Sequence, residues 1–322
     1  MSETITGYDV GALLYCPANS HHPIVDALTH ERFPRPFSLA FCLEDTVREE
    51  AVGEAEDALA GILGQIAAQA QRQAFYLPHI FIRVRSPLQL RRLAARYAPF
   101  ASILTGFILP KFFVDNCGGY LQAIGEIRSV SGLDPYYMPI FESAAMIDPV
   151  ARQEGLAAVR EQLAAVSDRI LNIRVGGNDL CHAFGLRRHV CDTIYDVRPV
   201  AAVLVDIASA FSTQYVVSGP VWEFYAGEGW DTGLRRELAQ DLLSGFIGKT
   251  VIHPAQIPVV NEVLQVSRAD YEDARSILSW DGQDPHLVCA SAAATRMNEY
   301  QTHHRWAAKT LRLAQVYGVR EG

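Results

Sequence analysis

Two apolar stretches, YYMPIFES (136–143) and ILNIRVGGNDL (170–180), each run into a single acidic side chain, Glu142 in the first and Asp179 in the second. Both have the composition of buried strands, and we expect them to be neighbours in a sheet. A carboxylate at the end of a buried strand is costly to desolvate unless it is paired, hydrogen-bonded or bound to a cation. Two such ends side by side therefore indicate a hard divalent metal ion.

The alternation of apolar runs and amphipathic segments extends from this pair in both directions. Strand-like runs occupy 12–17, 38–45, 79–85, 106–111, 136–143, 170–180, 213–224 and 246–254. A short helix-like segment lies between the first two runs, and segments with helical periodicity occupy 48–71, 88–98, 118–130, 149–166, 197–209, 234–245 and 255–266. Eight strand-then-helix units with strands apolar throughout predict an α/β fold, a closed (β/α)8 TIM barrel. An open doubly wound sheet is the competitor, and it lacks support because no GxGxxG turn follows the first strand.

The chain divides in two by its pattern. Residues 1–266 hold the predicted barrel, and residues 267–322 form a helical C-terminal extension, with YEDARSIL and a segment at 290–317 of helical composition. We expect this extension to cover the barrel mouth or to reach a neighbouring subunit.

The composition of the chain limits the classes of molecule that we expect it to bind. The 322 residues carry a formal net charge of −8 and are 49% apolar, so we expect no general nucleic-acid or anionic-membrane binding. The first ten residues lack the charged and apolar parts of a signal peptide, and no run approaches a membrane span, which predicts a cytoplasmic protein. The six cysteines form no close CxxC pair, so we interpret them as free buried thiols.

Polar residues end several of the other apolar runs. In a parallel barrel these positions share one rim, where catalytic residues lie. The candidates are Glu44, Asp45, Arg83, Arg85 and Lys111. Each has a plain alternative: a lysine after proline can be a solvated loop residue, and the two adjacent acids can be the start of a capped helix.

His253, within IHPAQ, is a further candidate at a strand end. A histidine ahead of proline in such a position is more often a hydrogen-bonded structural residue than a catalytic base, and we favour that interpretation.

Several motifs occur in an order and spacing that resemble a known family. They are LEDTV (43–47), IRVRS (82–86), GFILPK (106–111), IFESAAMI (140–147), GGNDL (176–180) and, most specifically, GFIGKTVIHPAQIPVVNEV (245–263). Together they resemble the citrate lyase β-subunit-like family of the HpcH/HpaI aldolase group. The segment at 296–319 resembles a divergent branch of these C–C bond lyases that accompanies tellurium-resistance genes.

The resemblance implies Mg²⁺ as cofactor, with Glu142 and Asp179 as its ligands. It also implies that Arg83 orients the substrate. Mg²⁺ typically takes one or two carboxylates and keeps the remaining octahedral positions for water or substrate oxygens, which agrees with this pair.

The other rim residues take supporting roles in the same hypothesis. We expect Arg85 and Lys111 to bind substrate beside Arg83. We expect Glu44 and Asp45 to orient Arg83 or metal-bound water in the catalytic site. Arg83 and Arg85 both belong to the strand-like run 79–85 and should face the same side, with Val84 on the other, because residues two apart in a strand point the same way.

Two functions stay open at this point. The first is a Mg²⁺-dependent carbon–carbon lyase or aldolase acting on a small 2-oxo or 2-hydroxy acid, with an acyl-CoA thioester as one form of the substrate. The alternative is a catalytically altered barrel that serves as a binding or assembly module in a biosynthetic complex. The family resemblance also implies a homo-oligomer, a trimer or a multiple of it.

Overall fold

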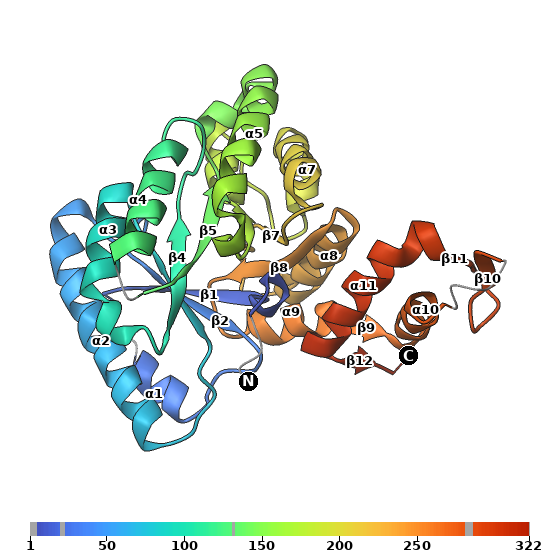
Figure 1. Ribbon diagram of the computed structural model, residues 1–322, viewed down its shortest axis with the longest axis horizontal. Helices are drawn as coiled ribbons and strands as arrows, with labels where there is room; N and C mark the ends of the chain where they lie inside the picture. The colour runs from blue at the N-terminus through green and yellow to red at the C-terminus, as the bar shows by residue number, and fades with distance from the viewer. Residues whose placement is uncertain (1–4, 20–22, 131–132, 281–285, 322) are drawn as a thin grey trace. The chain divides into compact units, whose positions relative to one another are not determined.

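Eight parallel strands close into a barrel, which confirms the predicted TIM-barrel architecture (Figure 1). The structure is a computed structural model, and it describes residues 5–19, 23–130, 133–280 and 286–321. The barrel strands are β1 (Ala12–Pro17), β2 (Ser38–Cys42), β3 (His79–Arg83), β4 (Leu104–Leu109), β5 (Tyr136–Phe141), β6 (Ile173–Val175), β7 (Val217–Gly219) and β8 (Phe246–Val251). Closure is direct, because Leu13 of β1 pairs with Ser38 of β2 on one side and with Thr250 of β8 on the other.

Helices follow the strands and cover the outside of the barrel (Figure 1). They are α1 (Ile24–Thr29), α2 (Val52–Arg72), α3 (Pro87–Arg96), α4 (Cys117–Val130), α5 (Pro149–Leu163), α6 (Gly177–Ala183), α7 (Arg198–Phe211), α8 (Trp230–Leu243) and α9 (Gln256–Leu264). Proline at the first turn of α3 and α5 suits a helix start, and Ser86 and Asp148 cap these two helices. In the described part of the chain, no helix is long and apolar enough to cross a membrane.

The strand alternation separates an apolar floor from a polar mouth inside the barrel. Leu13, Ala40, Phe81, Ile108 and Met138, one from each of the first five strands, belong to one buried cluster. Further along the same face, toward the carboxyl ends, come Tyr15 two positions after Leu13, Arg83 two positions after Phe81 and Glu142 four positions after Met138, because alternate residues of a strand share a face. The fold therefore directs charged groups into one end of an otherwise apolar interior.

The chain separates into two compact units, Met1–Val260 and Asn261–Gly322. The division falls within α9, a little before the boundary at 266 that the pattern of elements indicates. In the second unit, α10 (Arg268–Leu278) packs against α11 (Tyr300–Tyr317) around Ala274, Ile277 and Ala307.

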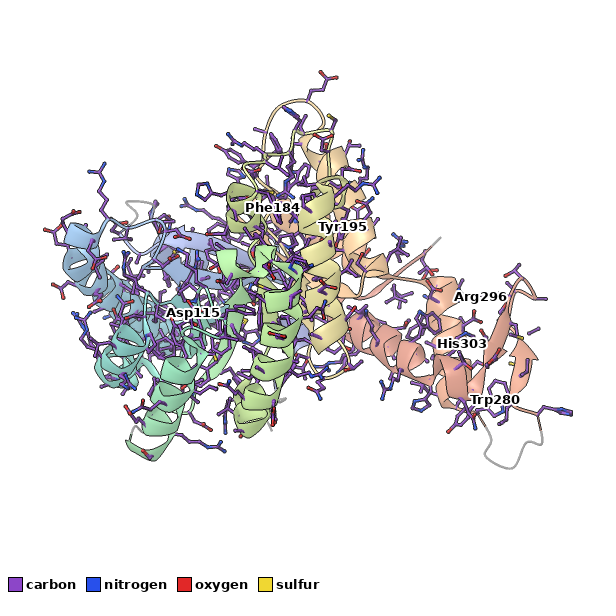
Figure 2. The ribbon with its side chains drawn as sticks, turned by 90° about the horizontal axis from the view of Figure 1, so that it is seen from above. Asp115, Phe184, Tyr195, Trp280, Arg296 and His303 are labelled. Carbon is purple, nitrogen blue, oxygen red and sulfur yellow. The ribbon has the colours of Figure 1, made fainter. Side chains whose placement is uncertain are left out.

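The expectation of a continuous helical segment at 290–317 was wrong in its first part. Strands β10 (Val288–Ala290) and β11 (Met297–Glu299) pair there as an antiparallel hairpin, and the helix begins only at Tyr300. A second small pair joins β9 (Val266–Ser267) to β12 (Val319–Arg320). Arg296, labelled with Trp280 and His303 in Figure 2, forms ion pairs with Asp270 and Asp273 of α10, which hold the hairpin to that helix.

A buried ion network stabilises the outer side of β8. Lys249 is fully buried, with Nζ 2.8 Å from Glu237 Oε1 and 2.7 Å from Asp241 Oδ2, both on α8. Glu237 also lies 2.7 Å from Arg188 Nη1, and the Tyr195 hydroxyl, labelled in Figure 2, donates to Asp241 at 2.7 Å. Lys249, the lysine of the GFIGK motif, therefore connects α8 to strand β8.

We expect Lys249→Met to lower the free energy of unfolding by about 3–5 kcal/mol, because Asp241 is left buried without a cation. Arg128→Met is the matched control, because it removes an exposed ion pair: the side chains of Arg128 and Asp168 are 52% and 51% exposed. This variant should lose less than about 1 kcal/mol of unfolding free energy. Urea denaturation measures both. Equal losses in the two variants would contradict a special role for the buried network.

Candidate active site

The polar residues predicted at the strand ends meet at one rim of the barrel. Arg83 is the last residue of β3, and Glu142 directly follows β5. Glu44 and Asp45 come shortly after β2, and Lys111 comes two residues after the end of β4. Because β2, β3, β4 and β5 are consecutive neighbours in the barrel, their carboxyl ends bring these five side chains together.

Arg83 is the centre of this cluster. Its Nη2 lies 2.8 Å from Glu142 Oε1, 2.8 Å from Glu44 Oε2 and 2.9 Å from Asp45 Oδ2. The side chain is only 8% exposed. Burial alone would lower the pKa of Arg83, but the facing carboxylates, Glu142 first, hold its pKa well above the usual value. Arg83 therefore stays positively charged and forms ion pairs with three acids.

Lys111 forms the outer edge of the cluster. Its Nζ lies 2.8 Å from Glu44 and 3.3 Å from Asp45, and the side chain is 48% exposed. Its backbone N–H donates to Glu142 Oε1 at 3.1 Å, and Asn116 donates to its carbonyl at 2.8 Å. These two contacts hold Lys111 at φ 49°, a left-handed conformation that is strained for a residue with a Cβ. The solvated-loop alternative is thus disfavoured, because backbone and side chain are both engaged.

Glu142 is the most perturbed acid of the site. Burial raises its pKa from 4.5 to about 7, Arg83 opposes this shift, and the negative charge of Asp179 adds to it. The two carboxylates are therefore close enough to repel each other. Gly176 permits this arrangement, because a Cβ on Gly176 would lie 2.2 Å from Glu142 Oε2. The two adjacent glycines of GGND are the sequence feature that permits this close approach. Only the structure shows that Glu142 is the side chain that lies against them.

Asp179 lies on a helix, and not at the end of a strand as we had expected. The stretch 170–180 is not one strand: β6 spans Ile173–Val175, and Asp179 lies in the first turn of α6, half-buried. The strand ends early because Gly176 and Gly177 begin the helix there. Glu142 and Asp179 nevertheless belong to adjacent units, since β5 pairs with β6.

Arg85 does not join the cluster. Its Nη1 donates to the carbonyls of Leu43, Glu44 and Val47, and its Nη2 lies 2.6 Å from Glu49. β3 ends at Arg83, so the strand alternation that would have put both arginines on one face does not reach Arg85. Arg85 instead ties down the loop that carries Glu44 and Asp45.

His253 also has structural contacts. Its Nδ1 accepts from the Ala255 N–H at 3.2 Å, and its ring stacks on Tyr225 with centroids 4.8 Å apart. Gln256 of the same motif accepts from the Ile252 and His253 N–H groups and donates to the carbonyls of Trp222 and Phe224. The IHPAQ motif thus connects the loops that follow β7 and β8.

The formal charge of the site favours a divalent cation. Glu44, Asp45 and Glu142 with Arg83 and Lys111 sum to −1, and Asp179 brings the total to −2. Among the described residues, no group of three or more histidine, cysteine, aspartate or glutamate side chains is arranged to hold a metal. Two carboxylates are within the usual number for Mg²⁺, which keeps several water or substrate oxygens. The donor set therefore fits Mg²⁺ and not a metal that needs a full protein cage.

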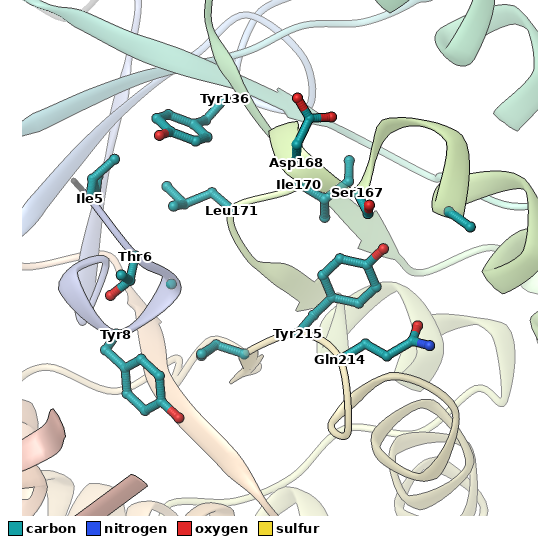
Figure 3. A pocket seen from close by; sticks show the side chains of 13 residues that line it. Ile5, Thr6, Tyr8, Tyr136, Ser167, Asp168, Ile170, Leu171, Gln214 and Tyr215 are labelled. Atoms are coloured by element: carbon teal, nitrogen blue, oxygen red, sulfur yellow. The ribbon is translucent and has the colours of Figure 1, made fainter. Parts of the chain in front are cut away.

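Two pockets lie at opposite ends of the barrel. One of about 380 Å³ lies at the carboxyl end of β1 and is lined mainly by apolar residues, including Tyr15, Pro17, Ile24, Phe33 and His253. The other, of about 610 Å³, lies at the amino-terminal end and is shown in Figure 3, where Tyr136, Leu171 and Tyr215 line it. The first shares the end of the barrel with the charged cluster, so it is the pocket that a substrate of that cluster can use.

The chain matches the family of C–C bond lyases of the TIM-barrel fold over residues 4–319. It belongs to that family. No curated protein sequence matches it.

Several solved structures have a similar fold. CitE of Mycobacterium tuberculosis, in complex with magnesium, acetoacetate and coenzyme A, is 18% identical, with 96% of this chain and 99% of that chain covered and a TM-score of 0.60. A citrate lyase of Burkholderia xenovorans LB400 is 14% identical, with 97% and 93% covered and a TM-score of 0.70. The citrate lyase β subunit of M. tuberculosis with oxaloacetate and magnesium is 20% identical, with 80% and 97% covered and a TM-score of 0.52. At these identities the likeness shows the fold alone.

The raised pKa of Glu142 gives a stability prediction with a definite sign. The folded state binds the proton of Glu142 more tightly than the unfolded chain, so ionised Glu142 destabilises the fold; the penalty is absent below pH 4.5 and complete above about pH 7. With chelator present, we expect Glu142→Gln to raise the free energy of unfolding by roughly 1–3 kcal/mol at about pH 8, with most of the gain lost at about pH 5.

Urea denaturation at the two pH values measures this difference. Arg83 keeps Glu44 and Asp45 as partners in the variant, so it is not left unpaired. A loss of stability at about pH 8 would show that the pair with Arg83 outweighs the burial of Glu142.

Proposed function

We propose that the protein is a Mg²⁺-dependent carbon–carbon lyase or aldolase that acts on a small 2-oxo or 2-hydroxy acid. The observation that carries the proposal is Glu142, a carboxylate 5% exposed at the barrel mouth whose pKa is raised to about 7 by burial and by the nearby charge of Asp179. A strongly perturbed acid beside a second acid, at the catalytic end of a barrel, is typical of a functional site.

Glu142 and Asp179 would hold the metal. The −2 charge of the cluster and the hard oxygen donors support this assignment. Bound Mg²⁺ supplies a Lewis acid, which stabilises the negative charge that develops on a substrate oxygen when a carbon–carbon bond breaks.

Arg83, with Glu44 and Asp45, orients the substrate. Arg83 is locked by three carboxylates through Nη2, while its buried Nε has no hydrogen-bond partner among the residues that the structure describes. The Nε edge of the guanidinium thus remains available for a substrate carboxylate. Glu44 and Asp45 position both Arg83 and Lys111.

Lys111 supplies a second cation at the solvent side of the site. An ammonium group has three donors, and Glu44 and Asp45 engage two of them. The third can bind a carboxylate or another anionic group of the substrate. Arg85 supports the site indirectly, because it holds the Glu44–Asp45 loop in place.

The relatives supply the chemical class of the substrate. Proteins of this fold have been crystallised with acetoacetate, oxaloacetate, magnesium and coenzyme A. Of these ligands oxaloacetate is a 2-oxo acid, and we infer a 2-oxo acid for this chain; the apolar pocket of about 380 Å³ beside the site can take the acyl part of a thioester. A homo-oligomer, and membership of the tellurium-resistance-associated branch suggested by residues 296–319, remain parts of the same hypothesis.

Calorimetry with pyruvate, glyoxylate and oxaloacetate tests the proposal. We expect binding to the wild type that requires Mg²⁺. Glu142→Ala and Asp179→Ala should weaken Mg²⁺ binding by more than the roughly 10- to 100-fold typical of losing an outer-shell partner. Asp168→Ala is the matched control, because this acid lines the pocket at the opposite end of the barrel and should leave binding unchanged.

Unchanged Mg²⁺ affinity in both site variants would remove the metal site. If no 2-oxo acid binds to the wild type, the alternative of a barrel that acts as a binding or assembly module would be favoured instead.

A further inference from the structure

A second arginine, Arg174 of β6, is buried in the barrel, and none of the acids that the structure describes pairs with it. It is 1% exposed, and its Nη2 donates to the Thr250 hydroxyl at 2.6 Å. Neither Nε nor Nη1 has a hydrogen-bond partner in the described part of the chain, and no carboxylate there forms an ion pair with it. The other deeply buried basic residues, Arg83, Arg152, Arg188 and Lys249, all have acidic partners.

The side chain of Arg174 points into the interior of the barrel. Thr250 belongs to β8, and Tyr15, whose hydroxyl interacts with Arg174, belongs to β1. Neither strand is adjacent to β6. Side chains of non-adjacent strands meet only across the lumen, so the unpaired nitrogens lie inside it, below the acids of the rim.

Tyr15 connects Arg174 to the candidate active site. Burial raises the pKa of Tyr15 to about 12, and the positive charges of Arg83 and Arg174 oppose that rise. The hydroxyl is therefore protonated near neutral pH and lies within the fields of both arginines. Because Arg83 Nε is also buried without a partner among the described residues, donors of two guanidinium groups and one phenol surround the same part of the lumen.

An isolated buried cation costs several kcal/mol, and a chain normally offsets that cost with an acid. The acids of the rim do not serve Arg174, because they pair with Arg83 and Lys111. Their remaining −2 charge matches a divalent metal. The charge of Arg174 is thus left without an acidic partner among the residues that the structure describes.

We propose that Arg174, together with the Tyr15 hydroxyl, forms an anion-binding site inside the barrel that takes a second anionic group of the substrate, a carboxylate or a phosphate-type group, while Arg83 Nε faces the first carboxylate. The inference rests on the proposed function for the identity of the substrate, although binding of an anion by Arg174 does not require it. Tyr15 also lines the pocket of about 380 Å³, so the proposed anion site borders that pocket. Arg174 is then a specificity-determining residue.

Three 2-oxo acids that differ only at C3 test the site: pyruvate, oxaloacetate with a carboxylate, and 3-phosphonopyruvate with a phosphonate. In the presence of Mg²⁺, we expect the wild type to bind one of the two dianionic or more highly charged acids about 10- to 100-fold more tightly than pyruvate. Which of the two is preferred distinguishes a carboxylate from a phosphate-type group. Arg174→Met should reduce that preference to less than about threefold while pyruvate affinity stays within about twofold.

The melting temperature distinguishes an anion-binding role of Arg174 from a purely structural one. Because Arg174 is an unpaired buried cation, Arg174→Met should leave the melting temperature of the ligand-free protein unchanged or raise it. Arg152→Met is the matched control: this buried arginine is paired with Asp206 at 2.7 Å, so its loss should lower the melting temperature and leave ligand preference intact. A lower melting temperature in Arg174→Met with an unchanged ligand preference would overturn the proposal.

A measurement on the wild type alone covers the case in which the variants do not fold. The Nε–H signal of Arg174 in an NMR spectrum, titrated with malonate and with inorganic phosphate in the absence of Mg²⁺, should shift in a saturable way with at least one of them. No shift with either anion would overturn the site. Failure of every 2-oxo acid to bind, with the Arg174 signal still saturating, would overturn the proposed function and keep the anion site.

Discussion

The site depends on the contact between Arg83 and Glu142. Glu142 directly follows a buried strand, and a carboxylate in such a place requires a nearby positive charge. Arg83 provides that charge from β3, two strands away, and its rigid guanidinium also fixes Glu44 and Asp45. The Lys111 amide adds a hydrogen bond to Glu142, which holds the loop after β4 in its left-handed turn. One ion pair thereby sets the positions of three loops at the mouth of the barrel.

The side chains inside the barrel differ between its two ends: those at one end form an apolar core, and those at the other form the candidate site. At the floor, Leu13, Phe81 and Met138 pack as an ordinary apolar core. Toward the mouth, the lumen holds Arg174 and Glu142, groups whose burial the chain compensates only in part. The balanced network of Lys249, Glu237 and Asp241 outside β8 is different, because there each charge has its partner. This incomplete compensation inside the lumen is the basis on which we propose a cation beside Glu142 and an anion beside Arg174.

Much of the architecture could be predicted because it is periodic. Runs of uniformly apolar residues at 136–141 and 246–251 require a strand buried on both faces, and amphipathic segments such as 52–72 require a helix with one covered face. The rim candidates followed from the same logic, since the carboxyl ends of parallel strands share one edge. Local errors arose where strand and helix signals overlap: β6 is short because two glycines start α6, and the apolar residues before 300 pair as a hairpin and not as a helix.

The sequence by itself determined the barrel, its eight units and the acids and bases at one rim, because these follow from local composition and from the order of elements along the chain. Only the tertiary structure decided which charges pair. Arg83 and Arg85 are two residues apart, yet one binds three acids in the site and the other binds a loop outside it, because the strand ends between them. Arg174 looks in sequence like one polar residue in an apolar strand. Its neighbours from β1 and β8 are Tyr15 and Thr250, with no acid among the described residues that pairs with it, and those contacts exist only once the barrel has closed.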